Sequence, residues 1–246
     1  MKKIALIPAR YASTRFPYKL MQVFGGKTVI RHTYDNTVAT GLFDAVMVVT
    51  DNELIFRDIT EHGGMAMMSR DDHESGSDRI AEAASLLEAD LILNVQGDEP
   101  FIDRTCLGQL LDAFQDKQVQ VASVMKKIQD EAQIQNPNIV KVVVDLHWNS
   151  LLFSRSPIPY HRDRADALPV YYEHIGIYAF RREALLRFPK MPMTPLEKAE
   201  KIECLRFLEN GMPLKMVLTD FEGVKIDVPD DLPKAVAYWE SVQQRT

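Results

Sequence analysis

Three basic side chains follow the first apolar run of the sequence. The run 4–6 leads into IPARYASTRFPYKL, which carries Arg10, Arg15 and Lys19, whereas the first acidic residue of the chain is Asp35. At an effective dielectric constant of about 20, one ion pair at ~4 Å contributes roughly 4 kcal/mol before desolvation is counted. Three such contacts are enough for a triphosphate. The loop is therefore a candidate nucleotide site, with a solvated basic surface as the alternative.

A second candidate is the acidic turn in ADLILNVQGDEPF. An apolar run over 91–95 indicates a buried strand, and the turn after it contains Asp98. A carboxylate at a strand end can hold Mg²⁺ together with phosphate oxygens and waters. An Asp in a turn also commonly caps its own backbone, so both interpretations of Asp98 stay open.

A third candidate lies in EGVKIDVPDDLP. Apolar residues alternate with Lys225 and Asp227, which predicts a half-buried strand over 224–228. The Asp-Asp pair before Pro233 is expected to cap the last helix, whereas Asp227 has no such local role. Asp227 is a candidate second magnesium ligand, with an exposed Asp on the strand as the alternative.

Two common phosphate loops are excluded. FGGKT ends like a Walker A motif, but that motif would need glycine where Met21 stands, and no GxGxxG follows the first strand. Phosphate would therefore be held mainly by side chains. In HESGSDRI, Ser75 and Gly76 stand at a helix start, where free backbone N–H groups can meet a ligand. Simple capping by Ser77 or Asp78 is the alternative.

Two segments of the second half carry further polar candidates. In YEHIGIYAF, strand periodicity puts His174, Gly176 and Tyr178 on one face, open to a ligand, although a bulge or a sheet-packing role of the glycine explains the pattern equally well. In TPLEKAEKIECLRFLENG, Glu203 falls on the apolar stripe of a predicted helix and needs a partner. That partner is either a ligand hydroxyl or Arg206. Glu197 is expected to form a capping box.

These residues need a scaffold of alternating strands and helices. Such alternation argues for a mostly parallel sheet with helices on both faces. In such a sheet, ligands bind beyond the carboxyl ends of the strands, where the basic loop and Asp98 are expected. Strands are predicted over 3–7, 45–50, 66–69, 90–96, 120–126 and 139–145, and helices over 29–41, 53–63, 78–89 and 105–115.

The alternation breaks after residue 145. A strand over 171–180 and a helix over 195–210 are predicted within an elaborated lobe at about 147–212, either a flap or a dimerising lobe. The chain then returns through strands at 214–218 and 224–228 to a helix over 232–243. We expect one domain, 1–246, rather than two.

Composition limits the classes of function. The 246 residues are 46% hydrophobic with a formal net charge of −6, which disfavours sequence-independent nucleic-acid binding. Residues 1–34 nevertheless carry +7, which indicates a small anionic ligand. Two cysteines without a metal-ligand pattern, and no apolar stretch of about 18 residues, predict a cytoplasmic protein that does not enter a membrane.

Together the motifs resemble one enzyme family. IPARYASTRFPYKL, SRDDHESGSDRIAE, ILNVQGDEPFI, NPNIVKVVVD, LLFSRSPIPY, HIGIYAFRREAL and GVKIDVPDDL occur in order across nearly the whole chain. They are similar to the 3-deoxy-manno-octulosonate (KDO) cytidylyltransferases, also called CMP-KDO synthetases. The resemblance implies a Rossmann-like α/β fold, usually as a homodimer. It also implies transfer of CMP from CTP to KDO with release of pyrophosphate, for lipopolysaccharide synthesis.

The resemblance also implies roles for single residues. Lys19, Asp98 and Asp227 would be catalytic, the two aspartates as ligands of Mg²⁺. The triphosphate would be held by Arg10, Arg15 and Lys19, and the cytidine would be surrounded by Ser69, Arg70, Ser75, Gly76 and Gln96. The sugar acid would face Arg155, His174, Tyr178 and Glu203.

The chain departs from the family at two places. Tyr18-Lys19-Leu20 stands where the family usually has GKP, which bears on the loop's backbone, and Cys204 replaces the Gln of EQLR. The Gln amide is a possible hydrogen-bonding group for the sugar. A cytidylyltransferase for a related acid, such as 8-amino-KDO or a sialic-type sugar, is therefore the alternative. A non-catalytic nucleotide-binding protein is disfavoured because both metal carboxylates are present.

Overall fold

The computed structural model describes residues 1–12, 16–73, 75–163, 168–221 and 223–243. The chain forms two compact units, which are Met1–Leu107 with Glu222–Thr246, and Gly108–Phe221. The predicted lobe at about 147–212 falls inside the second unit. Among the described residues, no helix combines the length and apolar composition needed to cross a membrane.

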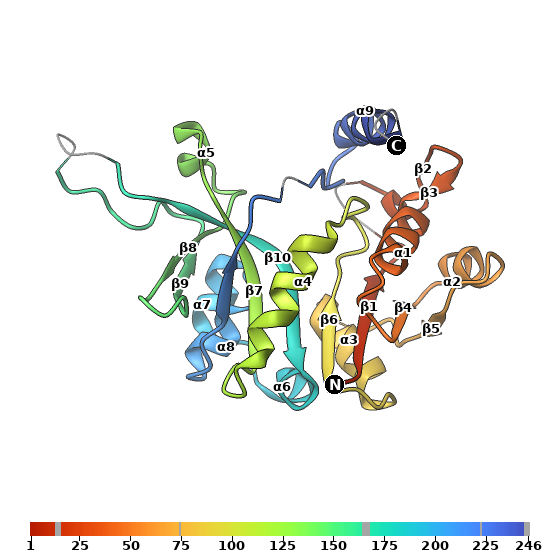
Figure 1. The fold of residues 1–246 in the computed structure, drawn as a ribbon, viewed down its shortest axis with the longest axis horizontal. Coiled ribbons are helices and arrows are strands. Elements are labelled where there is room, and N and C mark those ends of the chain that lie inside the picture. Colours follow the sequence, from red (N-terminus) through yellow and green to blue (C-terminus); the bar gives the residue numbers. More distant parts are fainter. Residues whose placement is uncertain (13–15, 74, 164–167, 222, 244–246) are drawn as a thin grey trace. The chain divides into compact units, whose positions relative to one another are not determined.

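The first unit is built on a parallel sheet with the strand order β6-β1-β4-β5 (Figure 1). Ile4 of β1 lies opposite Ala45 of β4 on one side and Ile92 of β6 on the other. Both faces of β1 are buried from Ile4 to Ile7, as is usual for a parallel sheet covered on two sides. The strands span Lys3–Ala9 (β1), Ala45–Thr50 (β4), Ala66–Met68 (β5) and Leu91–Asn94 (β6).

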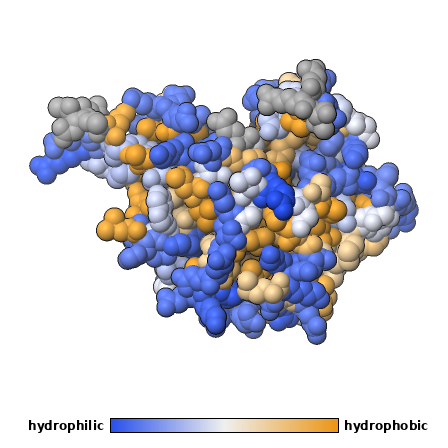
Figure 2. All heavy atoms as spheres, in the orientation of Figure 1, coloured by the Kyte–Doolittle hydropathy of each residue, from blue (hydrophilic) through white to orange (hydrophobic). Residues whose placement is uncertain are grey.

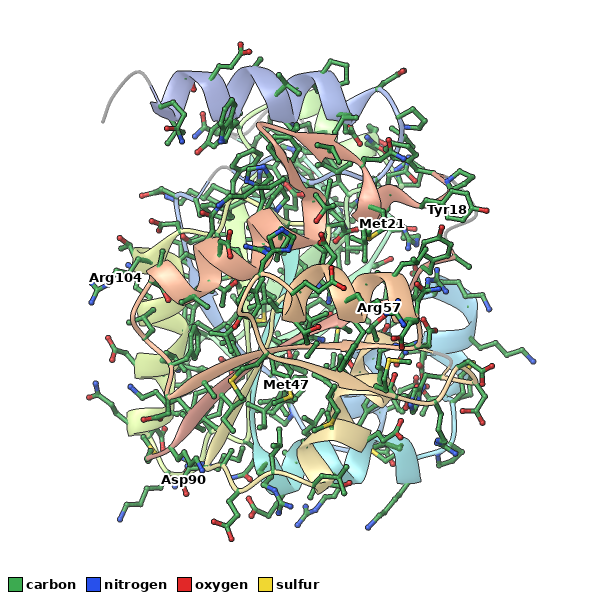
Figure 3. All side chains as sticks on the ribbon, turned by 90° about the vertical axis from the view of Figure 1, so that its right-hand side faces the viewer. Tyr18, Met21, Met47, Arg57, Asp90 and Arg104 are labelled. Atoms are coloured by element: carbon green, nitrogen blue, oxygen red, sulfur yellow. The ribbon has the colours of Figure 1, made fainter. Side chains whose placement is uncertain are left out.

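Three helices connect these strands. α1 (Val29–Ala39) and α2 (Glu53–Thr60) carry the chain outward from β1 to β4 and β5, and α3 (Gly76–Ser85) returns it to β6. Because such crossovers are right-handed, α1 and α2 cover one face of the sheet and α3 covers the other. In Figure 3, where Arg57 marks α2 and Met47 marks β4, helices lie on both sides of the sheet.

The start of α3 differs from the prediction. Ser75 is the N-cap, and its Oγ accepts a hydrogen bond from the backbone N–H of Asp78 at 3.1 Å. Capping by Ser77 or Asp78 is therefore wrong, because Gly76 is already helical and both residues stand in the first turn. The glycine also matters for packing, since a Cβ at Gly76 would lie 3.3 Å from Pro8 Cγ.

The C-terminal helix α9 (Asp231–Gln243) packs on a short hairpin of the first unit. Gly25, in the hairpin turn, has a φ of +54°, and a Cβ there would lie 2.6 Å from the indole of Trp239. Both the backbone conformation and the indole therefore require glycine. The hairpin strands are Val23–Phe24 (β2) and Lys27–Thr28 (β3), and the 3-10 helix η1 (Lys19–Met21) precedes them.

The second unit holds a mixed sheet. β7 pairs in parallel with β11 and antiparallel with β10, and the antiparallel pairs β10–β8 and β8–β9 extend it. Its strands are Val121–Lys127 (β7), Lys141–Val144 (β8), Ser150–Ser154 (β9), Tyr172–Arg181 (β10) and Lys215–Leu218 (β11). Its helices are η2 (Ala113–Gln115), α5 (Glu131–Gln135), α6 (Arg182–Arg187), η3 (Phe188–Lys190), α7 (Pro195–Glu200) and α8 (Leu205–Glu209), and α4 (Arg104–Asp112) contains the boundary between the units.

The helix predicted over 195–210 is two helices. α7 ends at Glu200, because the next residue, Lys201, has a left-handed backbone (φ 56°, ψ 46°), and α8 begins at Leu205. Glu203 therefore lies in the connection between two helices and not on a continuous apolar stripe. The prediction of one continuous helix was wrong because the apolar periodicity continues across the break between α7 and α8.

The strand predicted over 224–228 is also wrong. Among the described residues this segment carries no strand, and the backbone N–H of Ile226 bonds instead to the carbonyl oxygen of Asp98 at 3.0 Å. The alternation of polar and apolar residues has another cause here. Ile226 is fully buried while Lys225 lies at the surface, which gives the same pattern without a sheet partner.

Candidate active site

Lys19 lies between the two predicted metal ligands. Its Nζ is 2.5 Å from Asp98 Oδ2 and 3.3 Å from Asp227 Oδ1. The three side chains are only 15%, 12% and 29% exposed, respectively. The structure thus brings together the three residues predicted to be catalytic, from η1, the turn after β6 and the segment before α9. The contact between them was not predicted, since Lys19 was expected to meet phosphate.

The topology of the first unit explains this meeting. β1 and β6 are parallel neighbours, and the strand order reverses between them, because the chain runs outward from β1 to β4 and β5 and then returns past β1 to β6. Their carboxyl ends therefore form a switch point, where α/β sheets bind ligands. Gly97 permits the close approach of the two ends, since a Cβ there would lie 3.0 Å from the carbonyl oxygen of Pro8. The hydroxyl of Thr33 on α1 donates to the Gly97 carbonyl at 2.9 Å and holds the turn.

A third carboxyl group adjoins the pair. Burial raises the pKa of Glu99 to about 7, and the nearby charges of Asp98 and Asp227 act in the same direction against those of Lys19 and Lys225. Glu99 Oε2 is buried without a hydrogen-bond partner in the part of the chain that the structure describes. Glu99 was not predicted as a site residue, although a second acidic residue beside Asp98, in a turn between apolar segments, was a signal for it.

The donor set fits a nucleotide-bound magnesium ion. Within the described residues, no group of three or more His, Cys, Asp or Glu side chains is arranged to hold a metal. Mg²⁺ does not need one, because it is commonly bound by one or two carboxylates with waters and substrate phosphates. The ammonium of Lys19 already bridges Asp98 and Asp227, so this pair accepts a shared cation.

Other predicted nucleotide residues also lie in the first unit. Arg10 is exposed just after β1, Gln96 follows β6, and Arg15 lies outside the described residues. Ser69 and Arg70 follow β5, and the guanidinium of Arg70 is 66% exposed. Ser75 caps α3 and Gly76 opens it, so these residues follow the carboxyl ends of the parallel strands along the chain.

Arg79, which was not predicted as a site residue, organises this region. It is 4% exposed, and its guanidinium meets Asp51 Oδ2 at 2.7 Å and Ser69 Oγ at 2.5 Å. It also donates to the carbonyl oxygen of Arg70 at 3.2 Å. Arg79 therefore ties the residues that follow β4 to those that follow β5. An Arg directly before the buried Ile80 and Ala81 of α3 was the available signal, because a buried guanidinium requires partners.

The four predicted sugar residues all lie in the second unit. Arg155 donates through Nε to the carbonyl of Glu200 at 2.7 Å and through Nη1 to that of Pro137 at 2.8 Å. These bonds fix the guanidinium against the backbone. Glu203 is partly buried between α7 and α8.

His174 and Tyr178 lie side by side on β10, with ring centroids 5.4 Å apart. The register shifts between Ile175 and Tyr178, so the pairing with β7 is irregular at the glycine. Burial lowers the pKa of His174 to about 3, and its Nε2 lies 2.9 Å from Ser123 Oγ. His174 is thus a neutral hydrogen-bonding group. Burial also raises the pKa of Cys204, whose thiol interacts with the Tyr178 side chain.

Arg206 has a structural partner that the sequence did not reveal. It donates to both carboxylate oxygens of Glu197, at 2.6 and 2.7 Å, inside the second unit. Glu197 also accepts from the backbone N–H of Thr194 at 3.3 Å, as expected for the capping box. The expected structural role of Glu197 is confirmed.

Comparison with known proteins places the chain in a family. The model of the cytidylyltransferase family matches residues 4–218. A 3-deoxy-manno-octulosonate cytidylyltransferase of Flavobacterium johnsoniae is 56% identical over 240 residues, which covers 96% of this chain and 98% of the relative. The protein of the same name from Christiangramia forsetii is 51% identical over 235 residues, with 94% of each chain covered.

Two solved structures are similar to this chain. CMP:2-keto-3-deoxy-manno-octonic acid synthetase complexed with CTP is similar with a TM-score of 0.93 and 36% identity, covering 98% of this chain and 99% of that one. A 4-diphosphocytidyl-2C-methyl-D-erythritol synthase from Anaerococcus prevotii shares the fold, with a TM-score of 0.64 at 16% identity. The predicted α/β class is confirmed. The chain belongs to the 3-deoxy-manno-octulosonate cytidylyltransferase family.

Proposed function

We propose that the protein activates KDO with CTP, giving CMP-KDO and pyrophosphate for lipopolysaccharide synthesis. The observation that carries the proposal is the convergence of Lys19, Asp98 and Asp227 at the switch point of the parallel sheet. The chain also matches, over 98% of its length, a synthetase solved with CTP. Cations and carboxylates at one point suit the transfer of a nucleotidyl group.

In the proposed reaction, the anomeric hydroxyl of the sugar attacks the α-phosphorus of CTP. A new O–P bond forms, the hydroxyl proton passes to solvent, and the bond between the α-phosphorus and the bridging oxygen breaks as pyrophosphate leaves. Such transfers are catalysed mainly by positioning and by electrostatic stabilisation of the developing charge. Arg10, Arg15 and Lys19 would neutralise the triphosphate and the departing pyrophosphate.

We also propose a requirement for Mg²⁺, held by Asp98 and Asp227. Bound there, the ion would withdraw charge from the phosphate oxygens and lower the pKa of the attacking hydroxyl. Because Glu99 has a pKa of about 7, part of it is neutral near neutral pH and adds less negative charge than a third ordinary carboxylate would.

Specificity would come from two sets of residues. Ser69, Arg70, Ser75, Gly76 and Gln96 are proposed to contact cytidine. Arg155, His174, Tyr178 and Glu203 are proposed to contact the sugar acid. A neutral His174, oriented through Ser123, suits a sugar hydroxyl better than the carboxylate.

A pyrophosphate-release assay tests the function. CTP, UTP, ATP and GTP are each combined with KDO, 8-amino-KDO or N-acetylneuraminate, with Mg²⁺ or with EDTA. We expect turnover with CTP and KDO that EDTA abolishes. Faster turnover with another acid would show that this acid, and not KDO, is the substrate. Turnover in the presence of EDTA would show that the reaction does not require Mg²⁺. Binding of CTP without release of pyrophosphate, whichever acid is added, would show a nucleotide-binding protein without transferase activity.

We further propose a homodimer formed through the second unit. Apolar side chains reach the surface there, among them Leu146 (97% exposed), Leu151 (61%) and Tyr160 (82%). Figure 2 shows apolar surface at the left of the view, over the β8–β9 hairpin. Such residues are typical of an interface. Light scattering of the intact protein, with Leu146→Glu/Leu151→Glu as the variant, tests whether the dimer forms and whether these residues support it.

A cytoplasmic location is proposed because CTP is a cytoplasmic nucleotide and both cysteines are free thiols. Fractionation of cells that make the protein, with immunodetection, tests the location. Recovery with the membrane or periplasmic fraction would contradict it.

A further inference from the structure

We propose that the ammonium of Lys19 occupies the metal position of the nucleotide-free enzyme and that a divalent cation must displace it. This inference rests on the proposed magnesium site. Lys19 Nζ contacts one oxygen of each carboxylate, Asp98 Oδ2 at 2.5 Å and Asp227 Oδ1 at 3.3 Å. Lys19 is therefore the counter-ion that keeps two half-buried carboxylates together before a metal arrives.

The two cations cannot share these oxygens. A divalent ion bound by Asp98 and Asp227 would lie within a few ångströms of the ammonium, and repulsion between them is weakly screened because the side chains are 15%, 12% and 29% exposed. Entry of the metal therefore requires Lys19 to leave. In the reverse direction, the ammonium weakens metal binding for as long as it stays.

The displaced ammonium is better partnered when nucleotide is present than with the metal alone. Lys19 opens η1 directly after the basic loop proposed to bind the triphosphate, and its four-carbon stem lets Nζ move without moving the backbone. The triphosphate gives the ammonium new anionic partners. Metal and nucleotide therefore strengthen each other's binding through one side chain, which moves from carboxylate to phosphate.

A neighbouring lysine provides a matched control. Lys225 Nζ lies 3.6 Å from Asp227 Oδ2 and is 48% exposed, so it touches one carboxylate of the pair from the solvent side. Removing it changes the net charge as much as removing Lys19 does. It does not vacate the position between Asp98 and Asp227.

Binding of Mn²⁺ without nucleotide, followed by electron paramagnetic resonance, tests the inference. We expect Lys19→Met to bind Mn²⁺ at least about tenfold more tightly than the wild type. We expect Lys225→Met to differ by less than about fivefold, the scale of an exposed ion pair. The gain in Mn²⁺ affinity that CTP confers should shrink in Lys19→Met. Equal or weaker Mn²⁺ binding by Lys19→Met would overturn the inference.

The wild-type protein offers a second measurement that needs no variant. Acylation of lysine amines, read by mass spectrometry, should label Lys19 several-fold faster when Mg²⁺ is added, because the ammonium is released from its two carboxylates. Addition of CTP should protect it again. Unchanged labelling with saturating Mg²⁺ would contradict displacement. If Mg²⁺-dependent CMP-KDO synthesis is found without either effect, this inference alone fails, whereas displacement without any transfer would defeat the proposed function alone.

Discussion

The backbone N–H of Ile226 donates to the carbonyl oxygen of Asp98 at 3.0 Å. This bond joins the turn after β6 to the segment before α9, so main chain as well as side chains holds the two acidic residues together. The relative position of Asp98 and Asp227 therefore does not depend on Lys19 alone. It follows that removing one charge at the site should alter chemistry more than it alters the fold.

Conversion of either aspartate to its amide should abolish pyrophosphate release. We expect Asp98→Asn and Asp227→Asn each to lower kcat by about 10²–10³ or more, because a neutral amide is a poor magnesium ligand and leaves developing charge unshielded. Thermal unfolding should show a folded protein in both cases. Asp112→Asn, at an exposed position of α4, is the control and should keep its activity. Normal turnover by Asp98→Asn would remove Asp98 from the mechanism.

Loss of the Lys19 ammonium should mainly slow the chemical step. We expect Lys19→Ala to reduce kcat by roughly 10²–10³, the usual effect of deleting one preorganised group that stabilises charge. Steady-state kinetics with CTP varied at saturating KDO measures it. A rise in KM for CTP with unchanged kcat would instead assign Lys19 to ground-state binding.

Trp239 is expected to support the site from a distance. Its indole packs on Gly25, while Asp231 at the start of the same helix accepts from the backbone N–H of Asp227 at 3.1 Å. Loosening α9 therefore loosens Asp227. We expect Trp239→Ala to lower the free energy of unfolding by about 1–3 kcal/mol, less than for a fully buried Trp, and to lower kcat as well.

A conservative variant separates packing from general damage. Trp239→Phe keeps an aromatic ring beside Gly25 and should recover most of the stability and activity lost in Trp239→Ala. Urea unfolding and the pyrophosphate assay on the same preparations measure both quantities. Full activity in Trp239→Ala despite reduced stability would mean that α9 does not position Asp227.

His174 should make the protein sensitive to acid. Because its pKa falls from 6.5 to about 3 in the folded state, the unfolded chain binds the proton more readily between these values. This contribution to stability is complete above pH 6.5 and is lost as the pH falls toward 3. In wild-type protein this effect lowers the free energy of unfolding as the pH falls. We expect that decrease to be smaller in His174→Gln, by an amount on the order of a few kcal/mol. Urea unfolding from pH 7 to pH 4 measures it, and parallel curves for both proteins would contradict the assignment.

The parallel half of the fold could be predicted because its signals are local. The strand Ala45–Thr50 was predicted with the bounds that the structure has, since an apolar run between turn residues is enough for a strand buried on both faces. The position of Asp98 at a strand end follows from another such run, over 91–95. Its neighbours in space do not, because Asp227 stands 208 residues after Lys19 in the chain.

The errors arise where tertiary contacts override a local pattern. The apolar periodicity of 195–210 continues through Lys201, whose left-handed backbone no sequence rule required. The alternation at 224–228 reflects burial of Ile226 against the first unit's own turn and not a strand. The ion pair of Arg79 with Asp51 joins residues 28 positions apart and left no periodic signal.

The late position of Asp227 has a consequence for synthesis of the protein. A ribosome has already made the basic loop and the turn at Asp98 long before it reaches Asp227, so the growing chain carries Lys19 and Asp98 as an incomplete pair. The metal-binding chemistry can begin only after Asp227 has been translated. A message cut short upstream of that codon would therefore yield a protein in which Asp98 has no second carboxylate, however well its strands have paired.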